Sequence, residues 1–412
     1  MAFVLMIAYY FPPLGMGGVQ RMAKLARYLP RFGYDVKVLT VGKINYPAYD
    51  DSLLAELPPQ VKIYRSGSTD PARLGRLIPF FNSIGKAVKG RAKKSGLVWP
   101  DSKIGWEKAA VKLGGKIIVE EKIDIMLSSS PPVTAHLVAR ELKQKFNIPW
   151  VADFRDFWES YPPEMLYDDQ DLIDKSNKLL MEIGQFSDAV TSVTEAIGKS
   201  VTSGPIVIAG GYDEEDFSGI PMELPDDKFI LTYLGTVGDL HPLEPFLAGA
   251  NKAMAVNNDL GKQLEFRIIG ANDKNKIMHQ AKKYGLQSQI VVIDYLNHRQ
   301  ALREAATASV LLVSLPENFG GLLPGKVFDC LALPGAVLAS TPVGGATDLY
   351  LQKHNAGKCF APDDSDGMSQ FIGDLFAAFQ RRERWHKEGI EGATRKEVAR
   401  QFAGIFDDIR RK

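Results

Sequence analysis

The chain is poor in cysteine: only two of its 412 residues are cysteines, Cys330 and Cys359. Both stand next to apolar residues, so we expect buried thiols in a reducing compartment and no disulfide framework. The chain also lacks an excess of charge of one sign, because 50 basic and 49 acidic side chains leave a formal net charge of +1. A net charge so close to zero gives no reason to expect a nucleic-acid partner.

Long apolar runs are also missing. No uninterrupted apolar stretch approaches the roughly 18 residues of a transmembrane helix, so the sequence predicts none. Residues 1–8 are apolar, but they are few, they lack the basic start of a signal peptide, and an aromatic and proline run at 9–13 ends them. We therefore expect residues 3–8 to form a first buried strand and the protein to stay in the cytoplasm.

Several cofactor motifs are absent. The sequence has no Asp-x-Asp metal motif at the end of a predicted strand and no cluster of histidines and cysteines, so we expect no bound metal and no other cofactor. The glycine-rich segment 12–19 is not followed by Lys-Ser or Lys-Thr, which excludes a Walker phosphate loop. It is also not a clean Gly-x-Gly-x-x-Gly motif, so a dinucleotide fingerprint is not supported.

What the chain does contain is a regular alternation of short apolar segments and amphipathic helical segments. The predicted strands cover residues 3–8, 36–41, 123–128, 150–154, 229–234, 265–269, 290–293, 310–313 and 336–339. Continuous apolar strands that alternate with helices predict parallel sheets with helices on both faces. The length predicts two such domains, because a single hydrophobic core seldom grows to 412 residues.

We place these two α/β, doubly wound domains at residues 1–218 and 222–390. The junction is expected in the proline-bearing stretch 216–227. The last segment, 395–412, has the apolar spacing of a helix. It is either an ordinary terminal surface helix or a helix that crosses the junction and packs back on the first domain.

Two segments of the first domain carry candidate ligand-binding groups. The glycines of segment 12–19 join the first strand to a helix, where free backbone N–H groups and the helix dipole suit a phosphate or a reacting sugar. Asp153, Arg155 and Asp156 stand at the carboxyl end of strand 150–154, where open α/β sheets bind ligands. A structural glycine turn and a local Asp–Arg ion pair are the alternative interpretations.

The second domain has a comparable segment at residues 317–329, which follows strand 310–313. Glycines lead into a helix start, and Lys326 and Asp329 lie three residues apart on one helical face. A lysine at a helix start can pair with a diphosphate, and a carboxylate one turn later can accept both hydroxyls of a ribose. The alternative is an exposed salt bridge between the two residues, but the glycine-rich lead-in favours a ligand site.

The order of these pieces resembles retaining glycosyltransferases of the GT-B fold, family 4, in particular the branch that builds bacterial surface polysaccharides. The similar pieces follow one another along nearly the whole chain, at residues 9–13, 17–18, 129–132, 153–158, 210–213, 233–235, 268–270 and 323–329. The resemblance implies two Rossmann-like domains that face a central cleft. The acceptor would lie mainly on the first domain and the nucleotide sugar on the second.

The resemblance also implies roles for individual residues. The expected donor-binding residues are Gly17, Gly18, Gly235, Thr236, Gly270, Tyr295, Gly321, Leu323, Pro324, Lys326 and Asp329, and the candidate catalytic residues are Arg155 and Asp153. Within this set, Lys326 would contact the donor diphosphate and Asp329 the ribose. Gly270 and Tyr295 would lie near the nucleobase, and Arg155 or Asp153 would orient the sugar or the acceptor hydroxyl.

The sequence departs from the family pattern at several of these positions. Asp329 replaces the second glutamate of a pair, Gly321 stands where the first would be, and Glu317 comes four residues early. Arg155 stands near the position of a histidine, and the usual arginine and lysine are missing after Gly235. Two alternatives to sugar transfer therefore remain: a catalytically impaired sugar-nucleotide-binding subunit, and a nucleotide-sugar epimerase of the same fold.

The function that the resemblance implies is metal-independent transfer of a hexose, with retention, to a glycan, lipid-linked or other hydroxyl acceptor in polysaccharide biosynthesis. Residues 73–94 could indicate where the acceptor lies. They carry seven basic side chains, no acidic one and interleaved apolar residues. Such a segment is typical either of peripheral contact with an anionic membrane or of a solvated basic face. The membrane interpretation would place the protein at the inner face of the plasma membrane, beside a polyprenyl-diphosphate-linked acceptor.

Overall fold

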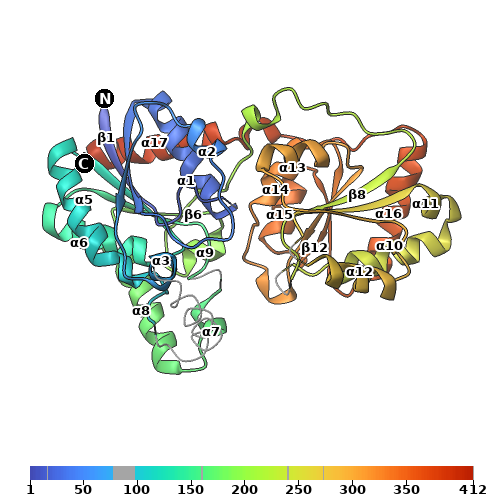
Figure 1. Ribbon diagram of the computed structural model, residues 1–412, viewed down its shortest axis with the longest axis horizontal. Coiled ribbons are helices and arrows are strands. Elements are labelled where there is room, and N and C mark those ends of the chain that lie inside the picture. The colour runs from blue at the N-terminus through green and yellow to red at the C-terminus, as the bar shows by residue number, and fades with distance from the viewer. Residues whose placement is uncertain (16, 78–97, 159–160, 239–240, 272, 412) are drawn as a thin grey trace. The chain divides into compact units, whose positions relative to one another are not determined.

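The chain folds into two compact units, each built on one parallel sheet. The computed structural model describes residues 1–15, 17–77, 98–158, 161–238, 241–271 and 273–411. The first unit comprises residues 1–210 and 395–412, and the second comprises residues 211–394 (Figure 1). The chain thus passes from the first unit to the second after residue 210, whereas the expected boundary was residue 218.

The first unit contains a seven-stranded parallel sheet in the order β3-β2-β1-β4-β5-β6-β7. Its strands are β1 (Ala2–Ile7), β2 (Tyr34–Val41), β3 (Lys62–Ser66), β4 (Ile125–Ser130), β5 (Trp150–Phe154), β6 (Ala189–Ser192) and β7 (Ile206–Val207). From the neighbouring strands β1 and β4 the chain winds outwards in opposite directions. The carboxyl ends of β1 and β4 therefore form the switch point at which such sheets bind ligands.

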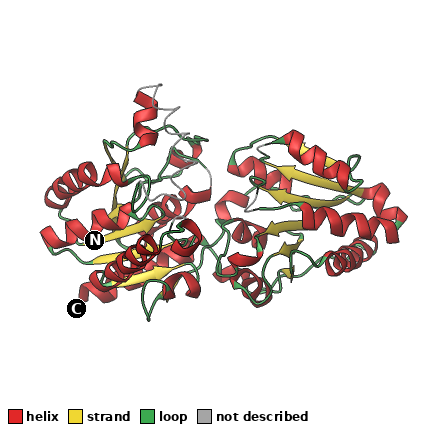
Figure 2. Cartoon of the chain, turned by 90° about the horizontal axis from the view of Figure 1, so that it is seen from below, coloured by secondary structure: helices red, strands yellow, loops and turns green. Residues whose placement is uncertain are grey.

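Helices cover both faces of this first sheet (Figure 2). They are α1 (Gly17–Tyr28), η1 (Leu29–Phe32), α2 (Ser52–Ala55), α3 (Pro71–Leu77), η2 (Ile104–Trp106), α5 (Glu107–Glu121), α6 (Thr134–Phe146), α7 (Pro163–Leu166), α8 (Gln170–Phe186), α9 (Glu195–Lys199) and α17 (Arg395–Arg411). Residues 78–94 of the basic segment lie outside the described residues, so its membrane contact stays a prediction. No helix in the described ranges is both long and apolar enough to cross a membrane.

The terminal helix α17 belongs to the core of the first unit. Its Phe402 and Phe406 lie in the same buried cluster as Met22 of α1. The hydroxyl of Tyr34, the first residue of β2, donates to Asp407 of α17 across 2.5 Å. Of the two expectations for this segment, the structure shows the one in which the helix packs on the first unit.

The second unit contains a six-stranded parallel sheet in the order β10-β9-β8-β11-β12-β13. Its strands are β8 (Phe229–Leu234), β9 (Leu264–Ile269), β10 (Ile290–Ile293), β11 (Val310–Ser314), β12 (Ala336–Ser340) and β13 (Gly357–Phe360). Here the chain winds outwards from β8 and β11, so the switch point of this sheet lies at their carboxyl ends. Both units are doubly wound parallel α/β structures, as the sequence predicts.

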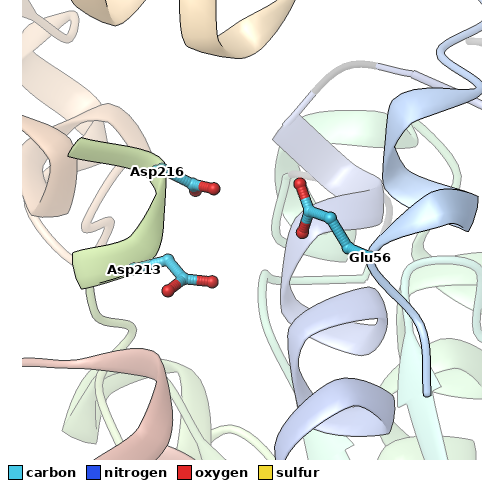
Figure 3. Close-up of side chains that lie close together, drawn as sticks. All are labelled: Glu56, Asp213 and Asp216. Atoms are coloured by element: carbon cyan, nitrogen blue, oxygen red, sulfur yellow. The ribbon is translucent and has the colours of Figure 1, made fainter. Parts of the chain in front are cut away.

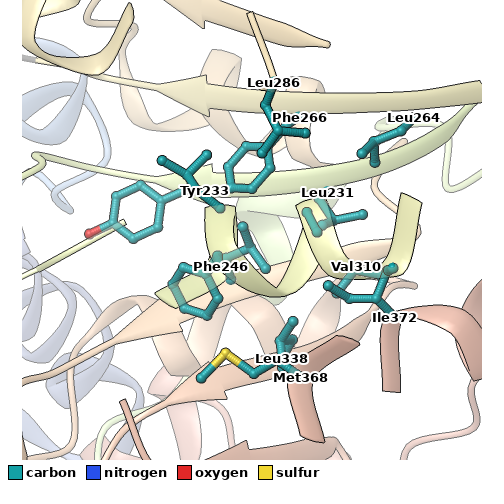
Figure 4. Close-up of a cluster of buried hydrophobic side chains, with 14 of the residues drawn as sticks. Leu231, Tyr233, Phe246, Leu264, Phe266, Leu286, Val310, Leu338, Met368 and Ile372 are labelled. Carbon is teal, nitrogen blue, oxygen red and sulfur yellow. The ribbon is translucent and has the colours of Figure 1, made fainter. Parts of the chain in front are cut away.

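The helices of the second unit are η3 (Glu214–Phe217), α10 (Glu244–Val256), α11 (Asn258–Gln263), α12 (Lys274–Lys283), α13 (His298–Ala305), η4 (Glu317–Phe319), α14 (Lys326–Ala332), α15 (Ala346–Lys353), α16 (Ser365–Gln380) and η5 (Ile390–Gly392). Alternate residues of β8 and β9, such as Leu231 and Phe266, pack against Phe246 of α10 and Ile372 of α16 (Figure 4). Tyr233 continues this buried row to the carboxyl end of β8, where the core meets the switch point.

Candidate functional site

Two glycine turns follow neighbouring strands of the second sheet. Gly235 comes directly after β8 with a φ of +108°, and Gly270 comes directly after β9 with a φ of +86°. The N–H of Gly235 donates to the carbonyl of Ile269 at 2.8 Å. A Cβ on Gly270 would lie 3.6 Å from the Cα of Gly235. Only glycine adopts such φ values readily, so the two residues keep bare backbone at this end of the sheet.

Lys326 begins α14, and its side chain reaches β8. Its Nζ donates to the Tyr233 hydroxyl across 2.7 Å and lies 4.1 Å from the centre of the Tyr233 ring. A Cβ on Gly235 would lie 3.5 Å from the same nitrogen, so the ammonium adjoins the glycine turn. Burial lowers the pKa of Lys326 to about 7. Within the described ranges, no carboxylate forms an ion pair with Lys326.

The surroundings of Lys326 destabilise its positive charge. Lys326 is half-buried, and the loss of surrounding water disfavours its charged form, which is why the pKa of Lys326 falls. An anion bound beside Gly235 would supply a counter-charge and raise that pKa again. A strongly perturbed titratable group at a switch point is the arrangement expected of a functional site.

His241 lies in the loop between β8 and α10, within electrostatic reach of Lys326. Its Nδ1 lies 3.0 Å from the carbonyl oxygen of Ser314, the last residue of β11. A carbonyl can only accept, so Nδ1 carries the proton and Nε2 is the unprotonated nitrogen of the neutral ring. Burial, and then the charge of Lys326, lower the pKa of His241 to about 4. The imidazole is therefore neutral at pH 7.

Asp329 lies three residues after Lys326, but its carboxylate adjoins a different set of side chains. Its Oδ1 lies 3.9 Å from Nε2 of His298, and that nitrogen lies 3.5 Å from Oδ2 of Asp216. Asp216 belongs to the short helix η3, at whose start Asp213 stands (Figure 3). The predicted ribose contact of Asp329 stays a prediction, and a ribose would have to share this carboxylate with His298.

The other predicted residues of the second unit lie around this turn and along the lead-in to α14. The carbonyl of Thr236 accepts a hydrogen bond from the Tyr233 hydroxyl at 3.1 Å. Leu323 is buried, and the carbonyl of Pro324 accepts from the N–H of Val327 at 3.0 Å, in the first turn of α14. Gly321 is half-buried. Tyr295, which follows β10, is 54% exposed and does not belong to the core.

Asp153, expected to be catalytic, is fully buried in the first unit. Its carboxylate accepts from Nε and Nη2 of Arg21 at 3.0 and 2.9 Å, from Ser129 Oγ at 2.8 Å and from Thr191 Oγ1 at 2.9 Å. Burial alone would raise the pKa of Asp153, but the charge of Arg21 and these hydrogen bonds lower it. With four donors around two oxygens, the geometry favours a buried anchor for Arg21 over direct contact with a sugar.

Arg155, the other candidate catalytic residue, donates hydrogen bonds to backbone carbonyls at the start of α1 and at the end of β4. Its Nε donates to the carbonyl of Ser130 at 3.2 Å, its Nη2 to that of Pro131 at 2.8 Å, and its Nη1 to that of Gly18. These bonds tie the end of β4 to the start of α1 at the switch point of the first sheet. Gly17 and Gly18 are exposed, and a Cβ on either would meet no atom within 4 Å. The start of α1 therefore leaves room for a ligand, and Arg155 has the contacts of a positioning residue.

Tyr233 and His241 also lie at this turn, although neither is among the expected donor-binding residues. Tyr233 follows the alternation of core residues in β8, and its ring is indeed buried. In the sequence, Tyr233 could have been noticed as a tyrosine two residues before the glycine turn at Gly235. For His241 the signal was its place in the loop that lacks the expected arginine and lysine.

Comparison with known proteins shows the fold. No protein-family profile matches the chain, and no curated protein sequence matches it. Its structure is similar to sucrose-phosphate synthase from Thermosynechococcus elongatus over 99% of this chain and 96% of that one, at 15% identity and a TM-score of 0.60. It is similar to a glycosyltransferase from Rickettsia africae over 99% and 98% of the two chains, at 14% identity and a TM-score of 0.62.

Anabaena HepE, solved in complex with UDP-glucose, is similar over 100% of this chain and 98% of that one, at 12% identity and a TM-score of 0.57. These neighbours are GT-B glycosyltransferases. The two parallel sheets and the similarity along the whole chain identify the fold of this protein as GT-B, with two Rossmann-like domains.

Proposed function

We propose that the protein is a glycosyltransferase that binds a nucleotide-diphosphate sugar at the carboxyl end of its second sheet. The proposal rests on the half-buried ammonium of Lys326, which Tyr233 holds beside the Gly235 turn and which no carboxylate neutralises within the described ranges. The fold supports it, because similar structures contain UDP-glucose and UDP-2-fluoro glucose.

In this proposal the donor diphosphate lies beside Gly235 and pairs with Lys326, and the ribose contacts Asp329. During transfer the bond between the anomeric carbon and the diphosphate oxygen breaks, and a bond to the acceptor oxygen forms. The acceptor hydroxyl releases its proton to water, and the departing diphosphate keeps the electron pair of the broken bond and gains negative charge. A protonated Lys326 stabilises that charge, so this leaving group needs no metal ion.

We further propose that transfer retains the anomeric configuration and moves a hexose to a glycan, lipid-linked or other hydroxyl acceptor in polysaccharide biosynthesis. A polyprenyl-diphosphate-linked acceptor would be reached at an anionic membrane through residues 73–94. Both points follow from the sequence resemblance and from the charge of that segment.

The test is thermal unfolding in the presence of UDP-, GDP- and dTDP-linked sugars, followed by a transfer assay with the donor that binds. A donor at 100 times its Kd should stabilise the fold by about 2.7 kcal/mol. Lys326→Ala should lose at least about half of this stabilisation at the same donor concentration. The control is Lys262→Ala, which removes a lysine that is 75% exposed in the same unit.

The assay separates the alternatives. Binding with neither transfer nor hydrolysis would support an impaired binding subunit. Conversion of the donor sugar without an acceptor would support an epimerase. If no nucleotide sugar stabilises the wild type, the proposed site at Lys326 is wrong.

A further inference from the structure

The loop that follows Gly235 contains one titratable side chain among its described residues, and the proposed function does not yet use it. This residue is His241, which lies between the turn and the start of α10. The Ser314 carbonyl fixes its ring at 3.0 Å through Nδ1. The hydrogen bond determines which nitrogen carries the proton, and therefore what the free nitrogen can do.

The neutral ring has no unused N–H with which to donate to an ionised phosphate oxygen. Its Nδ1–H is already donated to Ser314, and its Nε2 has a lone pair but no proton. Ionised phosphate oxygens are also acceptors, so two acceptors would face each other. Only the protonated ring, which carries N–H groups on both nitrogens, can donate to a diphosphate at this place.

Burial, and then the positive charge of Lys326, keep the ring of His241 neutral in the free protein. Lys326 of α14 faces it with a positive charge, and Tyr233 of β8 and Cys330 of α14 lie next to that lysine. Glu244, at the start of α10, accepts a hydrogen bond from Gln280 of α12. Asp239 lies outside the described residues.

Building on the function proposed above, we propose that His241 takes up a proton from solvent when the donor diphosphate binds beside Lys326, and that its Nε2–H then donates to a phosphate oxygen. The negative charge of the diphosphate cancels the repulsion from Lys326 and favours the imidazolium. His241 thereby supplies a second cationic contact in a loop that carries no arginine or lysine among its described residues.

The proton uptake by the two residues occurs in different pH ranges. The pKa of Lys326 is about 7, so this residue is already mostly protonated at pH 6, whereas His241, with a pKa of about 4, is neutral there. Binding at pH 6 should therefore protonate His241. Binding at pH 8 should protonate chiefly Lys326.

The experiment is nuclear magnetic resonance of the imidazole C2–H signals at pH 6, with and without saturating inorganic pyrophosphate as the probe. His241→Gln assigns the signal of His241, and His279→Gln, on the exposed face of α12, is the matched control. In the wild-type protein the His241 signal should move from the neutral to the protonated position. Lys326→Met should raise the pKa of His241 in the free protein, because the nearby charge is gone.

Binding of pyrophosphate provides a second readout. Loss of a charge-assisted hydrogen bond should weaken it about tenfold or more in His241→Gln at pH 6, and less at pH 8. His279→Gln should bind like the wild type. The inference is overturned if the His241 signal stays neutral at saturation, or if His241→Gln binds pyrophosphate as tightly as the wild type at pH 6.

Failure of this inference can be told apart from failure of the proposed function. If the Lys326 variant loses pyrophosphate while His241 stays neutral, the anion site stands and only the role of His241 falls. If neither pyrophosphate nor any nucleotide sugar binds the wild type, both the proposed function and this inference are wrong.

Discussion

The ammonium of Lys326 donates to the hydroxyl of Tyr233 across 2.7 Å, although 93 positions separate the two residues in the chain. The same hydroxyl donates to the Thr236 carbonyl at 3.1 Å, so the orientation of the tyrosine is determined from both sides. The pair joins the start of α14 to the end of β8. It holds a cation at the Gly235 turn, where the fold would place a ligand.

The first prediction concerns this hydrogen bond. Tyr233→Phe keeps the ring in the core and removes the acceptor for Lys326, which should cost about 0.5–1.5 kcal/mol of pyrophosphate binding. Tyr284→Phe, at the edge of the same core, is the control and should bind normally. The measurement is isothermal titration calorimetry. Unchanged affinity in Tyr233→Phe would show that the hydroxyl does not position Lys326.

The second prediction concerns the glycine turn. Gly235→Ala forces a side chain into a φ of +108° and puts a methyl group 3.5 Å from Lys326 Nζ. Strain of this kind costs on the order of 1–3 kcal/mol of stability. Gly219→Ala carries similar strain, with a φ of +72°, but meets no atom within 4 Å. Both variants should lose stability in urea unfolding, but only Gly235→Ala should also lose pyrophosphate affinity. Equal affinities would argue against an anion at the turn.

The third prediction concerns Asp153. Asp153→Asn leaves the buried Arg21 without its counter-charge and should cost about 3–5 kcal/mol in urea unfolding at pH 7. Because the folded pKa of Asp153 is lowered, its contribution is present above the unfolded pKa of about 3.9 and is lost as pH falls through the folded pKa. The stability difference between variant and wild type should therefore shrink in acid.

The control for this variant is Asp408→Asn, which changes a carboxylate that is 76% exposed on α17. It should leave stability nearly unchanged. If Asp153→Asn unfolded like the wild type but lost transfer activity, Asp153 would be catalytic after all.

The fourth prediction concerns α17. Phe402 is fully buried against the first unit, so Phe402→Ala should destabilise that unit by about 3–5 kcal/mol. Arg400→Ala removes an exposed side chain from the same helix and should cost little. Chemical unfolding of the two variants checks this. Similar stabilities would mean that α17 adds little to the core of the first unit.

Much of the fold could be predicted from the sequence, because buried parallel strands are continuous apolar runs. The bounds of β5, β8 and β10 agree with the predicted segments 150–154, 229–234 and 290–293. Three other edge strands, β3, β7 and β13, gave a weaker signal, although the edge strand β10 was predicted. Both residues of β7, Ile206 and Val207, are exposed, and β3 and β13 alternate without a fully apolar run.

The site was predictable only in pieces. Lys326 and Gly235 could be proposed separately from their motifs, but their contact depends on how α14 packs beside β8. The carboxylate of Asp153 looked available at a strand end. Its partner Arg21 lies 132 positions earlier in the chain, so nothing local in the sequence could show that the carboxylate was occupied.

The most direct test of the account is calorimetric titration of UDP-, GDP- and dTDP-glucose into the wild type and Lys326→Ala at pH 6, 7 and 8. We predict that at least one donor binds the wild type. Its affinity should fall about fivefold from pH 7 to pH 8, because free Lys326, with a pKa of about 7, must then take up a proton. Lys326→Ala should bind the donor more weakly by about 1.5–3 kcal/mol at pH 6. Its affinity should also depend much less on pH between pH 7 and pH 8 than that of the wild type. Equal donor affinity in the two proteins at all three pH values would contradict the account.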